Sequence, residues 1–206
     1  MKSLIDEITR IKKTKVKDII DKRIKEFKRL NSSSDRRWFY ELCFCLMTAN
    51  WKAQEGIELQ KELCKDGFCN WSEKSLAKHL KKRGHRFWPQ RAERIVLARR
   101  YTDNIKQILK KQEDPRQWLV KNIKGLGYKE SSHFLRNVGY TDYAILDRHI
   151  QDILKKEKLL EESKTLTPKR YLETERVLKK IAQKTKLNQA ELDLYIWYLK
   201  TGKVLK

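Results

Sequence analysis

Glycine and proline are scarce in this chain, with seven and three among its 206 residues. β-Branched residues almost never alternate with polar ones, so half-buried strands are not expected. Apolar residues recur instead at helical spacing, for example through residues 5–30, and predict an all-α protein. A chain of this length can bury a real core, in one large domain or two small ones.

Long apolar runs are also missing. None approaches the roughly 18 residues that a membrane span needs, and the opening Met1-Lys-Ser-Leu-Ile-Asp6 has no signal-peptide pattern. The four cysteines show no C-x-x-C spacing, so we predict buried free thiols in a reducing compartment and neither a metal, an iron–sulfur cluster nor another cofactor. We therefore expect a cytoplasmic protein without membrane contact.

Positive charge is abundant. Lysine and arginine number 49 against 27 acidic residues, which gives a formal net charge of +22 spread over the whole length. Such a field favours polyanions through steering and counterion release. A merely solvated surface is the alternative interpretation of the same composition.

One stretch decides between these interpretations. Gly125-Leu126-Gly127 lies between an apolar run ending at Ile123 and a helix-like run, 128–138. Two glycines in three residues allow a tight turn and a close approach of backbone N–H groups to a ligand. The helix after the turn would aim its positive dipole end at it. The pattern predicts an anion site, and the expected anion is a nucleic-acid phosphate.

This hairpin, with Lys129 two residues after its second glycine and Asp147 eighteen residues further on, resembles the helix-hairpin-helix DNA glycosylases. Within them the chain looks most similar to the archaeal type-2 8-oxoguanine glycosylase/AP lyases, from about residue 35 to the last. Supporting stretches are 46–51, 84–89 and 197–206. Lys124 departs from the family pattern, which usually has proline there, and from it we expect a looser turn with function retained.

The resemblance implies two helical lobes with an active-site cleft between them. One lobe would comprise 35–146 and end in the helix-hairpin-helix motif, 115–138. The other would combine 1–34 with 147–206. Helices are further expected at 90–109, from Arg148, at 168–184 and at 189–201, with start signals at Asp114-Pro115, Thr167-Pro168 and Asn188-x-x-Glu191.

The resemblance also implies the chemistry. Lys129 would attack the sugar C1′, displace the base and form a Schiff base that permits β-elimination. Asp147, an N-cap that stays ionised, would stabilise the cationic sugar and help deprotonate the lysine. Taken singly, each residue is ordinarily a solvated lysine or a simple cap. Their combination with the hairpin favours catalysis.

Further residues are expected to contact DNA. The backbone of Gly125, Leu126 and Gly127 would bind a phosphate. Arg86 in the basic loop 81–89 and His149 would contact the DNA backbone. Asn50 would enter the duplex opposite the extruded base, or else only cap the next helix. Five residues are expected to recognise the base: Trp197, Lys206, His133, Phe87 and Trp88. The alternative for them is an ordinary structural role, in core packing or in a frayed tail.

The function predicted from the sequence is base excision repair. The enzyme would be a monomer, associated with the nucleoid through double-stranded DNA that contains an oxidised base. It would remove 8-oxoguanine and cleave the strand 3′ to the abasic site. Two alternatives stay open: the same chemistry on an oxidised pyrimidine, and a non-catalytic helix-hairpin-helix DNA-binding module.

Overall fold

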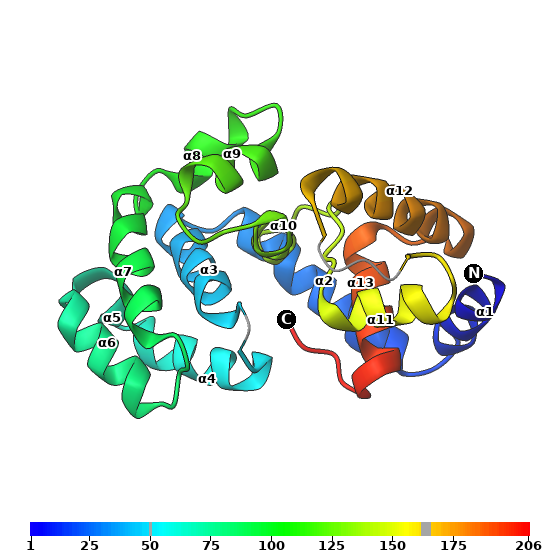
Figure 1. Cartoon of the computed structure of the whole chain (residues 1–206), viewed down its shortest axis with the longest axis horizontal. Helices are drawn as coiled ribbons and strands as arrows, with labels where there is room; N and C mark the ends of the chain where they lie inside the picture. Colours follow the sequence, from blue (N-terminus) through cyan, green and yellow to red (C-terminus); the bar gives the residue numbers. More distant parts are fainter. Residues whose placement is uncertain (50, 162–165) are drawn as a thin grey trace. The chain divides into compact units, whose positions relative to one another are not determined.

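The computed structural model describes residues 1–49, 51–161 and 166–206, and within them every regular element is a helix (Figure 1). The all-α prediction is confirmed. In chain order the elements are α1 (Lys2–Ile11), α2 (Val16–Asn31), α3 (Asp35–Thr48), α4 (Ala53–Leu63), α5 (Gly67–Asn70), α6 (Glu73–Lys82), α7 (Trp88–Ala98), the 3-10 turn η1 (Arg99–Tyr101), α8 (Ile105–Lys110), α9 (Pro115–Asn122), α10 (Tyr128–Asn137), α11 (Arg148–Lys156), α12 (Pro168–Thr185) and α13 (Gln189–Thr201).

The chain divides into two compact units. Unit 1 comprises Met1–Asn31 with Leu135–Lys206, and unit 2 comprises Ser32–Phe134. Residues 135–146 therefore belong to unit 1, whereas the sequence assigned them to the middle lobe. The reason is local, because Gly139 lies against the backbone of Phe27 and Lys28, and the hydroxyl of Tyr171 donates to the Ala144 carbonyl. The lobes and the cleft stay a prediction.

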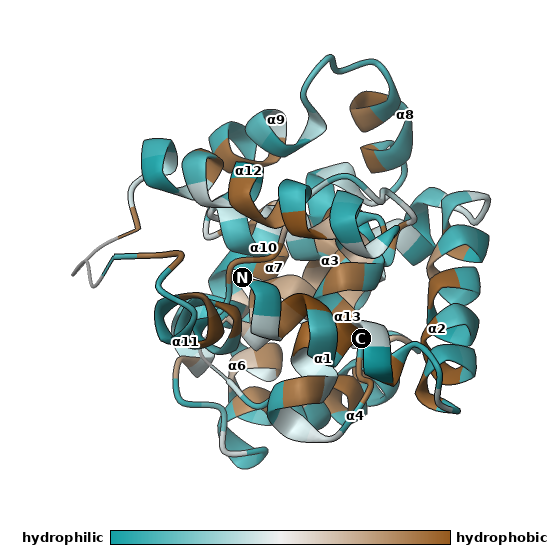
Figure 2. Ribbon diagram, turned by 90° about the vertical axis from the view of Figure 1, so that its right-hand side faces the viewer, coloured by the Kyte–Doolittle hydropathy of each residue, from teal (hydrophilic) through white to brown (hydrophobic). Residues whose placement is uncertain are grey.

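Unit 1 buries amphipathic helices around α13. The N-terminal stretch forms two helices, and both show alternating hydrophilic and hydrophobic bands along the ribbon (Figure 2). Their buried faces include Ile8, Ile20 and Phe27. Helix α13 begins with a capping box in which Asn188 and Glu191 each bond the other's backbone N–H. It is buried over most of its first two turns.

Unit 2 is built on α3, whose residues from Leu42 to Met47 are wholly buried. The ring of Trp38 meets Phe134 edge to face, with centroids 6.2 Å apart. The single helix expected at 90–109 is wrong, since α7, η1 and α8 replace it. At the end of α7, Arg99 Nε donates to the Phe68 carbonyl at 2.8 Å and Nη2 donates to the Trp71 carbonyl at 2.6 Å.

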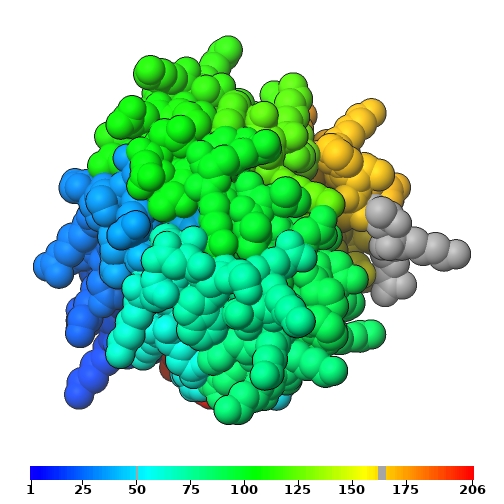
Figure 3. Space-filling model, turned by 90° about the vertical axis from the view of Figure 1, so that its left-hand side faces the viewer, coloured from blue at the N-terminus to red at the C-terminus, as the bar shows by residue number. Residues whose placement is uncertain are grey.

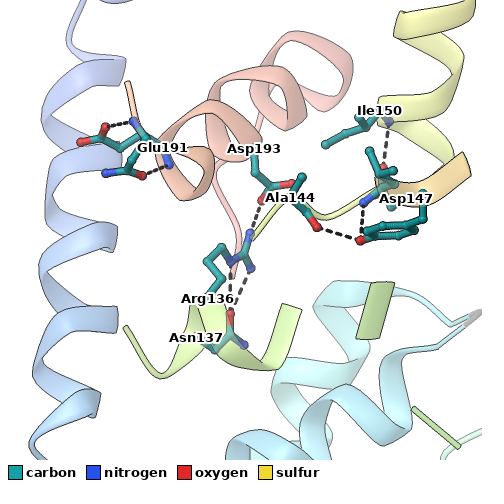
Figure 4. A network of polar contacts seen from close by, with 10 residues as sticks. Arg136, Asn137, Ala144, Asp147, Ile150, Glu191 and Asp193 are labelled. Carbon is teal, nitrogen blue, oxygen red and sulfur yellow. Dashed lines mark hydrogen bonds and ion pairs between the residues drawn. The ribbon is translucent and has the colours of Figure 1, made fainter. Parts of the chain in front are cut away.

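A buried ion pair joins the end of α10 to α13 within unit 1 (Figure 4). Arg136 donates to Asp193 and, at 3.1 Å, to the side-chain oxygen of Asn137. The two charged side chains are 5% and 7% exposed. Breaking such a pair leaves one charge buried without its partner, which costs far more than the pair itself contributes.

We therefore expect Asp193→Ala to lower the free energy of unfolding by about 3–5 kcal/mol. Urea denaturation followed by circular dichroism measures the loss. The double variant Arg136→Met/Asp193→Leu removes both charges and should recover most of it. A loss below about 1 kcal/mol in the single variant would mean that water solvates the pair.

Candidate active site

The predicted hairpin turn lies between α9 and α10, in unit 2. The Leu126 N–H donates to the Ile123 carbonyl at 3.2 Å, and the Ser131 N–H donates to the Gly127 carbonyl at 2.9 Å, which starts α10. Gly125 has a φ of +96°, a conformation that side chains other than glycine rarely adopt. Leu126 is buried and anchors the turn in the core. The backbone N–H groups are thus held by both chain geometry and packing.

Helix α7 supports this turn from outside. A Cβ atom on Gly125 would lie 2.7 Å from Arg94 Nε and 2.9 Å from Cζ, so the arginine occupies the space that glycine leaves. Lys124, which stands where the family usually has proline, donates to Glu93 of α7 at 2.6 Å. This ion pair gives the turn a tether that proline would not provide.

Lys129 is the second residue of α10 and its side chain is 26% exposed. Its Nζ lies 3.6 Å from Glu130 Oε1, an ion pair rather than a hydrogen bond. The other oxygen of Glu130 lies 3.4 Å from the position that a Cβ of Gly127 would take. The amine is therefore accessible, next to the turn and beside one carboxylate.

Asp147 caps α11 in unit 1, as predicted. Its Oδ1 accepts from the Ile150 N–H at 2.8 Å (Figure 4). Sequence reasoning missed the support behind it. The Tyr171 hydroxyl donates to the Ala144 carbonyl at 2.7 Å and accepts from the Leu146 N–H at 3.2 Å, which fixes the segment leading into Asp147. A tyrosine on an amphipathic helix carries no local pattern that would reveal this role.

His149 and Trp197 come together in unit 1, on α11 and α13. Their rings meet edge to face with centroids 4.9 Å apart. His149 Nδ1 and Trp197 Nε1 are buried and make no hydrogen bond to the described residues. Both side chains are half-buried. Their part in base recognition stays a prediction.

The tail after α13 is not frayed outwards. Gly202 ends the helix in the left-handed conformation, with φ of +69°, and the Lys203 N–H donates to Thr201 Oγ1 at 3.3 Å. Val204, Leu205 and Lys206 are half-buried. The role of the tail in base recognition stays a prediction.

The basic loop between α6 and α7 interleaves cations with aromatic rings, as expected. Lys81 Nζ lies 5.3 Å from the Trp88 ring centre, and Arg86 Cζ lies 5.2 Å from that of Phe87. Arg86 is exposed and both aromatic side chains are half-buried. Figure 3 shows the molecule from the side on which the cyan-to-green part of the chain faces the viewer. The loop can therefore present charge to DNA while its aromatic side chains are partly packed.

Two further residues, His133 and Asn50, are predicted to contact the base or the DNA. His133 lies four residues after Lys129 and its ring meets Phe44 edge to face at 5.6 Å, a packing contact within unit 2. Asn50 lies outside the described residues.

The cysteines are thiols, with Cys43 and Cys45 buried and the other two half-buried. In the described part of the chain no three His, Cys, Asp or Glu side chains are placed to hold a metal ion.

His85 was also missed, although it fixes the basic loop. It is 1% exposed, and its Nε2 bonds the Met47 carbonyl at 2.8 Å while Nδ1 accepts from the Phe87 N–H at 3.2 Å. Its ring lies 4.3 Å from that of Trp51. The side chain thus ties the loop to the end of α3. Burial lowers the pKa of His85, and nearby Arg91 adds to this, whereas the Met47 bond opposes it.

The lowered pKa predicts a pH dependence of stability. The unfolded chain takes up the proton first, so the His85 contribution is fully present above about pH 6.5 and is lost as pH falls through the lower folded pKa. We expect the stability difference between the wild type and His85→Gln to shrink between pH 7.5 and pH 5. Urea denaturation at both pH values measures it. A constant difference would contradict the lowered pKa.

Comparison with known proteins identifies the relatives of this chain. Residues 20–187 match the family model described as 8-oxoguanine DNA glycosylase. A relative from Methanocaldococcus jannaschii, named 8-oxoguanine DNA glycosylase/AP lyase, is 53% identical, covering 98% of this chain and 99% of its own. A relative of the same name from Thermotoga maritima is 43% identical, covering 100% of both chains.

Solved structures agree with these matches. The Methanocaldococcus jannaschii 8-oxoguanine glycosylase/lyase in complex with a 15mer DNA containing 8-oxoguanine superposes with a TM-score of 0.95 at 52% identity, covering 99% of this chain and 100% of that one. The 8-oxoguanine DNA glycosylase of Thermotoga maritima gives 0.93 at 42% identity, covering 100% and 99%. In the described part of this chain no helix is long and apolar enough to span a bilayer.

Proposed function

Because the chain belongs to the 8-oxoguanine DNA glycosylase family, we propose that it excises 8-oxoguanine from duplex DNA and cleaves the strand 3′ to the resulting abasic site. The observation that carries this proposal is the placement of Lys129, an accessible amine in the first turn of α10, directly after the glycine hairpin. A hairpin that only bound DNA would need no amine at this position.

The reaction uses Lys129 as nucleophile. Its neutral amine attacks C1′, and the C1′–N9 bond breaks with its electron pair leaving on the base, which is then protonated. The C1′–O4′ bond then breaks with its electron pair leaving on O4′, which takes up one of the two amine protons. The other proton goes to solvent, and the opened sugar is a Schiff base, C1′=Nζ. Loss of a C2′ proton then expels the 3′ phosphate, which breaks the strand, and water finally releases the lysine.

Asp147 supplies negative charge to the same reaction. Positive charge develops on the sugar as the base departs, and an ionised carboxylate stabilises it. The N-cap bond to Ile150 holds Oδ1 and so fixes the direction of the carboxylate. The proposal requires Asp147 of unit 1 and Lys129 of unit 2 to face the same nucleotide, in the cleft expected from the family.

The proposed partner is double-stranded DNA with an oxidised base, bound by a monomer at the nucleoid. Incision of end-labelled duplexes carrying 8-oxoguanine or an oxidised pyrimidine tests the substrate. We expect cleavage of the first, with a β-elimination product. Preference for the oxidised pyrimidine would show that this lesion is the substrate instead. Binding without any cleavage would show a DNA-binding module without catalytic activity.

The C-terminal tail is proposed to read the damaged base. 8-Oxoguanine differs from guanine by an N7–H donor and O8, and a fixed acceptor such as the Lys206 carboxylate would favour the new donor. Deleting 204–206 should reduce 8-oxoguanine excision by about 10²-fold, on the scale of a lost polar contact at a specific site. Cleavage at a ready-made abasic site should change little. Equal loss of both activities in single-turnover assays would refute this role.

A further inference from the structure

Arg94 of α7 lies against the hairpin turn, and Arg91, one helical turn earlier, lies near Glu130 of α10. The proposed chemistry assigns neither arginine a role. Arg91 is 4% exposed. Its Nη2 donates to the Ala49 carbonyl at 2.7 Å, while Nε and Nη1 have no hydrogen-bond partner among the described residues. A buried guanidinium is destabilising when its donors have no acceptor. Its donors favour a ligand with several acceptor oxygens.

Arg94 is one helical turn further along α7 and extends across Gly125. Its Nε and Cζ lie 2.7 and 2.9 Å from where a Cβ of that glycine would be. Nε is buried without a hydrogen-bond partner among the described residues, although the side chain as a whole is only half-buried. The guanidinium is therefore placed against the backbone of the turn and close to its surface.

Positive charge predominates around Arg91 and Arg94. Burial lowers the pKa of Arg91, the charge of Arg94 lowers it further, and Glu130 opposes both. Glu130 is also the carboxylate paired with Lys129, at 3.6 Å. Glu93, the acidic residue between the two arginines in sequence, is paired with Lys124 at 2.6 Å. Lys129 and Arg91 thus share the carboxylate of Glu130 in the first turn of α10.

We propose that Arg91 and Arg94 complete the hairpin as a receptor for one backbone phosphate of DNA. Arg94 contacts the phosphate oxygens from α7, and the N–H groups of Gly125 and Gly127 contact them from the turn, since the Leu126 N–H is bonded to the Ile123 carbonyl. Arg91, one helical turn earlier on α7, bonds the Ala49 carbonyl and adds positive potential. Gly125 is then required for two reasons. Its φ is positive, and a Cβ atom at this position would clash with the side chain of Arg94. The inference rests on the proposed function only for its ligand, DNA.

The salt dependence of binding tests the inference. Each phosphate contact adds about 0.9 to the slope of log K against log salt. Arg94→Gln should reduce the slope by about 0.9 and weaken binding to undamaged and lesion duplexes alike by about fivefold at physiological salt. Arg94→Lys keeps the charge and should keep the slope. The matched control is Arg176→Gln, which removes the same charge from an exposed position on α12.

Neutral methylphosphonates identify the contact itself. Placed one at a time along an undamaged duplex, they should reveal one phosphate whose neutralisation weakens the wild type but not Arg94→Gln, a coupling that a purely structural role would not produce. Additive effects at every phosphate, or a slope in Arg94→Gln equal to that of Arg176→Gln, would overturn the proposal. Because undamaged duplex is used, failure of excision by the wild type would refute the proposed function and leave this result unaffected.

Discussion

Replacing Lys129 by glutamine should abolish strand cleavage, with a loss of about 10³-fold or more, as expected when a nucleophile is removed. Glutamine has no basic amine, so neither the attack on C1′ nor the Schiff base can form. DNA binding should persist, because the phosphate contact is proposed for the backbone of the turn, which the substitution leaves unchanged. Single-turnover incision and a binding titration on the same 8-oxoguanine duplex measure the two effects.

Lys124→Gln is the matched control for this variant. It removes the same charge from the same turn, where Lys124 is paired with Glu93 on the protein surface, and it leaves Lys129 in place. We expect cleavage by this control to stay within a few-fold of the wild type, since exposed ion pairs contribute little. Cleavage by Lys129→Gln at the control rate would show that another amine is the nucleophile.

Replacing Asp147 by asparagine should lower 8-oxoguanine excision by about 10²–10³-fold, on the scale of a lost electrostatic stabiliser. The neutral amide cannot offset the positive charge that develops on the sugar. Stability should change little, because asparagine is an equally good N-cap and can accept the same bond from Ile150. Base release in single turnover and urea denaturation separate the two quantities.

The chain provides a control with the same structural role. Asp114 caps α9 and accepts from the Gln117 N–H at 3.0 Å. Asp114→Asn should therefore leave excision near normal while making the same chemical change at a helix start. If the Asp147 and Asp114 variants behave alike, Asp147 is only a cap.

Local patterns explain why part of this site could be predicted from the sequence. The turn at Gly125 needs a glycine for its φ of +96°, and Asp147 caps the helix that begins one residue later. Both features depend on residues that are neighbours in sequence. The proline and capping-box starts of α9, α12 and α13 were found for the same reason.

Other parts depend on contacts between residues far apart in sequence, and the sequence showed nothing of them. His85 bonds the Met47 carbonyl 38 residues away, and Arg91 bonds the Ala49 carbonyl 42 residues away. In the sequence both look like members of a basic, solvated stretch. The break of the expected helix at 90–109 has the same origin, since Arg99 bonds carbonyls about 30 residues earlier. The pairing of Lys129 with Asp147 came from the family resemblance alone.

We propose that Lys129 forms a covalent bond with the damaged nucleotide. Borohydride reduction during the reaction with an 8-oxoguanine duplex converts the Schiff base into a stable amine, and mass spectrometry of the digested adduct locates it. The account predicts the adduct on the peptide that contains Lys129. An adduct on another lysine or on the amino group of Met1, or no adduct under conditions in which the strand is cut, would contradict it.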